Sequence, residues 1–226
     1  MTSDIKYNKA IEYIYGLNKY GIKLGLKNVG FLMSLFDNPH LKTKIIHIAG
    51  TNGKGSTAAM LFSILRAAAY KVGLYTSPHL VHFQERMRVN EKLISQQEVY
   101  ALLERIKPAI NKVANTEGYK HPTFFEVITT MALVYFYEKG VDFAIMETGL
   151  GGRLDATNIC QSLISVITHI DYDHMDKLGN TLSEIAREKA DIIKEKTSVV
   201  NAEQYQEAQK VIASIAQKRH CRLYSI

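Results

Sequence analysis

Short apolar runs alternate along the chain with longer segments of helical periodicity. The clearest short runs cover residues 44–49, 72–76, 141–147 and 163–170, and residues 198–201 fit the same pattern. Continuous apolar runs of this length are typical of strands buried on both faces, and the helical segments between them suit crossovers between parallel strands. We therefore predict an α/β fold in which helices flank a mostly parallel sheet.

Some of the predicted helices open with a capping box, in which a Ser or Thr and the Glu three residues later satisfy each other's free amide groups. These helices begin at Ser95, Thr123 and Thr181. We expect the first to run towards residue 113, the second to end at Gly140, and the third to reach about residue 194. The second is apolar nearly all round, so it should be largely buried on the sheet. The first forty residues predict two more amphipathic helices.

The composition adds limits to this fold. A hydrophobic content of 46% over 226 residues supports a sizeable core. The longest apolar stretch is too short and polar for a membrane span, and the N-terminus lacks the apolar segment of a signal peptide. Cys160 and Cys221 lack metal-ligand spacing, so we expect reduced thiols and a cytoplasmic protein.

The net charge of +6 favours anionic partners. The lysines are scattered, and no basic run is interleaved with aromatic residues, so a nucleic-acid groove is disfavoured. An anionic small molecule remains compatible with the same charge. Nothing in the sequence implies a membrane or a protein partner.

A glycine-rich turn follows the first predicted strand and precedes a helix, which is the arrangement of a phosphate-binding loop. Its match to G-x-x-x-x-G-K-[ST] is imperfect, because Ile48 replaces the first glycine and Gly55 follows Lys54. The alternative is a glycine-rich turn without function. The candidate nucleotide-binding residues are Gly50, Thr51, Asn52, Gly53, Lys54, Gly55, Ser56 and Thr57.

Polar side chains follow three other predicted strands. Ser77 lies in TSPHL, Glu147 ends an apolar strand before a glycine-rich loop, and His174 follows the next strand. The ends of parallel strands meet at one edge of a sheet, so these segments should converge there. Taken singly, TSPHL could be an ordinary turn, Glu147 a solvated carboxylate, and His174 a surface or hydrogen-bonding residue.

Together the segments AGTNGKGST, TSPHL with ERMRVN, ETGLGGRLDATN and DHMDKLGNTLSEIAREKADII resemble the folylpolyglutamate synthase/dihydrofolate synthase family of the Mur ligase superfamily. The resemblance implies a P-loop domain like the Mur ligase central domain. It implies an ATP-dependent ligase that activates the carboxylate of a folate or dihydropteroate as an acyl phosphate and joins it to L-glutamate.

The resemblance also assigns roles to residues. Lys54, Lys189 and His174 take part in catalysis, and Ser77, Glu147 and His174 bind two magnesium ions. Lys189 is carbamylated, although a solvated helix lysine is the alternative. Phe125, Asp155 and Ala156 contact the pterin, and Phe125 could instead be a core aromatic. Asp191 stands where the family has a small neutral residue, and its effect on Lys189 stays open.

Family members continue into a second, Rossmann-like domain with contacts to the nucleotide base and glutamate. We therefore expect residues 1–226 to form a truncated N-terminal ATP-binding domain, without the C-terminal ligase domain, that is inactive alone. The alternatives are a non-catalytic ATP-binding fragment and a Mur-type cell-wall peptide ligase. The choice between dihydropteroate and folylpolyglutamate as the acceptor stays open.

Overall fold

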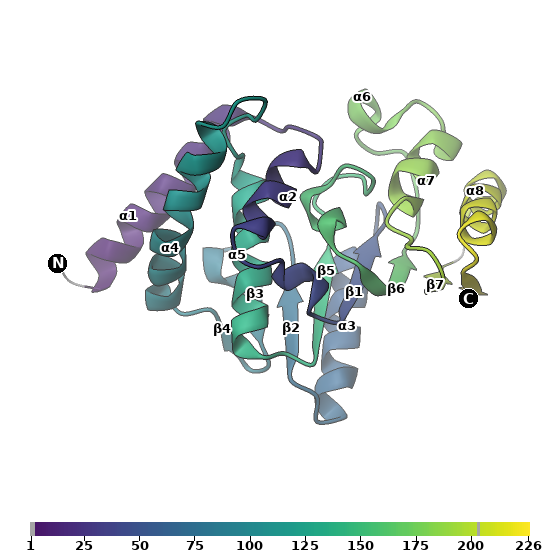
Figure 1. The fold of residues 1–226 in the computed structure, drawn as a ribbon. Helices are drawn as coiled ribbons and strands as arrows, with labels where there is room; N and C mark the ends of the chain where they lie inside the picture. Colours follow the sequence, from purple (N-terminus) through teal and green to yellow (C-terminus); the bar gives the residue numbers. More distant parts are fainter. Residues whose placement is uncertain (1–2, 203) are drawn as a thin grey trace.

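The computed structural model describes residues 3–202 and 204–226, which build one eight-stranded sheet between helices (Figure 1). The strand order is β4-β3-β2-β5-β1-β6-β7-β8. Every neighbouring pair is parallel except β2 with β3 and β3 with β4. The strands are β1 (Ile45–Ala49), β2 (Val72–Tyr75), β3 (Met87–Val89), β4 (Lys92–Leu93), β5 (Phe143–Glu147), β6 (Ser162–Ile167), β7 (Ser198–Asn201) and β8 (Arg222–Ser225).

Helices cover both faces of the sheet. The helices are α1 (Ser3–Gly16), α2 (Lys27–Ser34), α3 (Lys54–Ala67), α4 (Gln96–Ala114), α5 (Phe124–Lys139), α6 (Met175–Leu178), α7 (Leu182–Ala190) and α8 (Gln206–Lys218). In Figure 1, α1, α2, α4 and α5 gather at one side, and α6, α7 and α8 lie at the β7–β8 end. Among the described residues, no helix is long and apolar enough to cross a membrane.

The layers follow from the alternation of side chains along each strand. Tyr75 and Met146 point into the cluster formed by α1, α2, α4 and α5. Leu74 and Ile145 point to the other face, where they pack with Phe62 of α3. The predicted burial of α5 is confirmed, because residues 126–136 are all buried.

The capping boxes are confirmed at all three helix starts, and α5 ends at Gly140 as predicted. Two predicted ends were too late. β6 ends at Ile167 because the residues after it turn to bond the first glycine-rich loop. Helix α7 ends at Ala190, since the amides of Ile192 and Ile193 bond to carbonyls three residues back instead of four. Arg219 Nη1 satisfies the Asp191 carbonyl at 3.2 Å.

Candidate active site

The glycine-rich loop after β1 forms a tight turn into the N-terminus of α3, which begins at Lys54. Gly53 has φ +83°, a conformation that few residues other than glycine adopt. Lys54 Nζ donates to the carbonyls of Gly50 at 2.9 Å and Thr51 at 3.1 Å. The order of strand, glycine-rich turn and helix is confirmed, and the Lys54 side chain folds back over the turn.

The segment after β6 holds this loop in place. Thr51 N donates to the His169 carbonyl at 2.9 Å, and Thr51 Oγ1 donates to the Asp171 carbonyl at 2.9 Å. A Cβ atom on Gly50 would lie 1.8 Å from Thr168 Oγ1, and the φ of Gly50 is +154°. Only glycine therefore fits at position 50.

Glu147 ends β5 beside the same loop and is 5% exposed. Its Oε2 accepts a hydrogen bond from Ser77 N at 3.3 Å and lies 3.9 Å from an ideal Cβ on Gly55. Burial raises the pKa of the Glu147 carboxyl, while the Ser77 amide and the charge of Lys54 oppose that rise. The predicted convergence of the β1, β2 and β5 ends is thus observed, and Glu147 is not a solvated carboxylate.

Lys189 reaches the same place from α7. It is 2% exposed, and its Nζ donates to the Gly50 carbonyl at 2.9 Å. Burial, and then the charge of Lys54, lower the pKa of Lys189 to about 8, while the nearby charge of Asp173 opposes the shift. The alternative of a solvated helix lysine is wrong, because Lys189 is buried against the loop.

His174 is more exposed than Glu147 and Lys189. Its side chain is 52% exposed and is 3.6 Å from Asp173, and no hydrogen bond joins it to Ser77 or Glu147. Within residues 3–202 and 204–226, no three His, Cys, Asp or Glu side chains are grouped so as to hold a metal ion. The metal role of His174 stays a prediction.

Asp191 does not contact Lys189. Its carboxylate forms an ion pair with the guanidinium of Arg219, which directly follows α8, and accepts a hydrogen bond from it. The lowered pKa of Lys189 arises from burial and the charge of Lys54. The side chain of Asp191 is engaged by Arg219.

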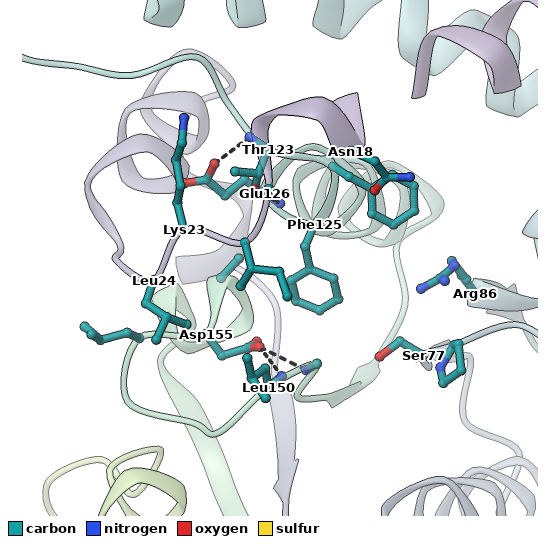
Figure 2. Close-up of a pocket in the computed structure, with 17 residues that line it drawn as sticks. Asn18, Lys23, Leu24, Ser77, Arg86, Thr123, Phe125, Glu126, Leu150 and Asp155 are labelled. Atoms are coloured by element: carbon teal, nitrogen blue, oxygen red, sulfur yellow. Dashed lines mark hydrogen bonds between the residues drawn. The ribbon is translucent and has the colours of Figure 1, made fainter. Parts of the chain in front are cut away.

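A pocket of about 400 Å³ opens beside Ser77, the residue whose amide bonds to Glu147 (Figure 2). The ring of Phe125 stands inside it, and Asp155 and Ala156 lie on its wall. Phe125 also packs on Gly149, where a Cβ atom would be 2.4 Å from its Cζ. Phe125 is thus both a packed aromatic and a pocket residue.

Asp155 uses its carboxylate inside the protein. Oδ2 accepts from the amides of Gly149 at 3.0 Å and Leu150 at 2.8 Å, and Oδ1 accepts from Thr157 N at 3.0 Å. Burial raises the pKa of Asp155 and these bonds oppose the rise. The carboxylate therefore fixes the shape of the loop between β5 and β6 that forms one wall of the pocket.

Several pocket residues were missed by sequence reasoning. They are Asn18, Lys23, Arg86 and Glu126. Arg86 lies in the quoted segment ERMRVN and Glu126 in a predicted capping box, but neither pattern indicates that the side chain is buried beside a cavity. Only the packing of residues 17–23, which follow α1, with α5 and the β2–β3 connection brings them together.

The Mur ligase middle domain family model matches residues 48–226. The chain is 46% identical over 221 residues to a dihydrofolate synthase/folylpolyglutamate synthase of Bacillus subtilis, covering 97% of this chain and 51% of that protein. It is 32% identical over 210 residues to the folylpolyglutamate synthase of Lacticaseibacillus casei, covering 93% of this chain and 49% of the relative. The chain spans about half the length of these curated relatives.

Solved structures share the fold over nearly the whole chain. A folylpolyglutamate synthase from Thermotoga maritima has a TM-score of 0.90 at 43% identity, covering 99% of this chain and 50% of the other. A structure described as an FPGS–AMPPCP–folate complex has a TM-score of 0.90 at 31% identity, covering 97% of this chain and 53% of the other. The latter protein binds an ATP analogue and folate together.

Proposed function

The chain belongs to the Mur ligase family through a middle domain over residues 48–226, and from this premise we propose that it supplies the ATP and acceptor sites of a folate-glutamate ligase. The reaction joins the carboxylate of a folate or dihydropteroate to L-glutamate at the expense of ATP. The observation that carries the proposal is the meeting of the glycine-rich loop, buried Glu147 and the 400 Å³ pocket at one sheet edge.

ATP binds with its phosphates at residues 50–57. The free amides at the start of α3 and the charge of Lys54 stabilise the outer phosphates. Lys54 exchanges its bonds to the Gly50 and Thr51 carbonyls for phosphate oxygens. The complex of the related FPGS with AMPPCP supports this assignment.

Magnesium fits the donors at this edge. Glu147 is a buried carboxylate, and no Lys, Arg or His side chain of the described residues lies within ion-pair distance of it. Oxygen donors such as Glu147 and the Ser77 hydroxyl suit a hard cation. We assign these two to one ion, and His174 with modified Lys189 to a second. Bound magnesium would offset phosphate charge during transfer.

Lys189 is suited to carbamylation. With its pKa lowered to about 8, roughly a tenth of the Lys189 amine is neutral at pH 7, far more than for an ordinary lysine, and only the neutral amine adds carbon dioxide. The product carries a negative charge beside Lys54 and releases one proton. Carbon-13-labelled bicarbonate should give a carbamate resonance in the wild type that is absent in Lys189→Arg. A resonance that persists in Lys189→Arg contradicts the assignment.

The pterin occupies the pocket, with its rings on Phe125 and its edge on the backbone at Asp155 and Ala156. Its carboxylate end then points towards Ser77 and the phosphate loop. A carboxylate oxygen attacks the γ-phosphorus of ATP, ADP leaves, and an acyl phosphate forms. The amine of glutamate attacks the acyl carbon, loses a proton, and phosphate departs. The protein positions two anions that otherwise repel each other.

A second candidate function is the binding of nucleotide and pterin without ligation. The glycine-rich loop and the 400 Å³ pocket provide for these two ligands, and the site described above assigns no residue to glutamate. We also propose a cytoplasmic location, because both candidates bind ATP.

Two measurements test the proposal. Calorimetry should detect magnesium-dependent binding of AMPPCP to the wild type and at least about tenfold weaker binding to Lys54→Ala. Labelled glutamate is then supplied with ATP and either dihydropteroate or tetrahydrofolate. Incorporation identifies the ligase and its acceptor, whereas binding without incorporation identifies the second candidate. If AMPPCP does not bind, both are wrong. Pteroate displaced by a muramyl peptide would instead indicate a cell-wall ligase.

A further inference from the structure

Arg86 is a buried cation without a protein anion. It ends the short helical turn Phe83–Arg86 before β3 and is 7% exposed. Among the described residues, no carboxylate lies within 4.0 Å of its guanidinium. Burying a charge is costly unless a counter-charge and hydrogen bonds compensate it, so this position calls for a ligand.

The free side of Arg86 faces the pocket. Its Nε donates to His79 Nδ1 at 2.7 Å, whereas no described residue accepts a hydrogen bond from Nη1 or Nη2. Figure 2 shows the guanidinium beside the Phe125 ring and above Ser77. The nearby Glu85 is engaged by the amides of residues 80, 81 and 82 and is not available to Arg86.

A chain of contacts fixes the guanidinium in this direction. Because His79 Nδ1 accepts from Arg86, its proton is on Nε2, which lies 3.1 Å from the hydroxyl of Tyr15. Tyr15 stacks on Phe124 with ring centroids 5.8 Å apart, and Arg86 lies over the same Phe124 ring at 5.4 Å. His79 is therefore a positioning residue. The two Nη groups remain as a pair of parallel hydrogen-bond donors, which we call the Arg86 fork.

A fork of this kind matches a carboxylate, which accepts two parallel hydrogen bonds from one guanidinium. The nucleotide phosphates are not the natural partner, because no residue of the 50–57 loop lines this pocket. Phe124 lies under Arg86, and Phe125 and Leu150 also line the pocket, so its walls suit an aromatic acid.

We propose that Arg86 is the specificity-determining residue for the acceptor's carboxylate, selecting an acid over its neutral analogues and aiming it at Ser77 and the phosphate loop. The proposal rests on the assignment of the pocket to the acceptor. It further states that His79 acts only by holding Arg86, so that any side chain offering an acceptor to Nε preserves the selection.

The test compares two probes, pteroate and its neutral carboxamide, by fluorescence titration of the whole chain with AMPPCP present. The wild type should bind pteroate at least about tenfold more tightly than the amide. Arg86→Gln should abolish this preference and leave amide affinity within about threefold. Arg88→Gln is the matched control, since Arg88 pairs with Glu91 and does not line the pocket. It should retain the full preference.

Further variants distinguish a loss of carboxylate selection from a loss of folding. Arg86→Lys keeps the charge but not the fork and should reduce the preference with an unchanged melting temperature. His79→Asn, which offers an acceptor, should preserve it, and His79→Leu should reduce it. Equal wild-type affinities for the two probes, or a preference that survives Arg86→Gln, would overturn the inference alone. If neither probe binds while AMPPCP does, the acceptor assignment fails with it.

Discussion

The carbonyl of Gly50 accepts hydrogen bonds from two lysines. Lys54 reaches it from α3 and Lys189 from α7, each at 2.9 Å. Two cations held at one oxygen repel each other, which is one cause of the lowered pKa of Lys189. An anion bound at the loop would offset this local positive charge, which agrees with the proposed phosphate site.

Gly50→Ala should disable this arrangement. The new Cβ would meet Thr168 Oγ1 at 1.8 Å, and the φ of +154° is strained for alanine. We expect a loss of roughly 3 kcal/mol or more in the free energy of unfolding. AMPPCP affinity should also fall, because the loop must shift. Urea denaturation and calorimetry measure the two effects.

A matched glycine provides the control for this substitution. Gly16 ends α1 with φ −58°, and a Cβ there would meet nothing within 4 Å. Gly16→Ala should therefore leave both stability and AMPPCP binding near the wild-type values. Similar losses in the two variants would show that the contact with Thr168 is not the cause.

For single residues, the sequence predicts which side chains lie at the sheet edge better than it predicts how deeply they are buried. Lys54, Ser77 and Glu147 follow strand ends, and the geometry of a parallel sheet brings such residues to one edge. The burial of Glu147 and Lys189 could not be predicted, because it depends on loops that cross the edge from other elements. Arg86 was missed for the same reason: nothing in ERMRVN shows that its charge is enclosed by α1 and α5.

At the scale of elements, the sequence predicted helix starts correctly where both partners of a capping box are present. Capping boxes marked three helix starts because both partners lie within one turn of the chain. Strands β3, β4 and β8 were missed. They are two to four residues long, and β4 and β8 are largely exposed, so no apolar run marks them. Their pairing is set by tertiary contacts.

The capping boxes of α4 and α5 allow a comparison between an exposed and a buried helix start. Glu98 N donates to exposed Ser95 Oγ at 3.2 Å, and Glu126 N donates to Thr123 Oγ1 at 3.3 Å, with Thr123 only 3% exposed. Ser95→Ala should cost about 1 kcal/mol, because water replaces the hydroxyl. Thr123→Ala should cost roughly 2–3 kcal/mol, because a buried amide loses its partner. Equal costs in urea denaturation would contradict this.

At the scale of the molecule, the core divides into three apolar clusters. One lies under α1, α2, α4 and α5, one under α3, and one between the β6–β8 side of the sheet and α7 with α8. The phosphate loop follows β1, the strand between β5 and β6, so it lies where these clusters meet. Stability and the shape of the site therefore depend on the same central strands.

A buried histidine in β1 should make the whole fold sensitive to acid. His47 is fully buried, its Nε2 lies 2.8 Å from Thr157 Oγ1, and burial with the charge of Lys194 lowers its pKa to about 3. Between the unfolded value near 6.5 and about 3, only the unfolded chain binds this proton, so stability falls as pH falls. The expected slope is about 1.4 kcal/mol per pH unit.

The variant His47→Gln isolates this contribution. Buried Glu126, Glu147 and Asp155 have raised pKa values and act in the opposite direction, because the folded chain binds their protons more readily. Both proteins contain these carboxyls, so subtracting the two pH profiles from urea denaturation cancels them. Below pH 6 we expect the wild type to lose about 1.4 kcal/mol per pH unit relative to His47→Gln. No such difference should separate the wild type from His220→Gln, whose side chain is exposed. Parallel profiles for the wild type and His47→Gln would show that protonation of His47 does not destabilise the fold and that other groups cause the acid sensitivity.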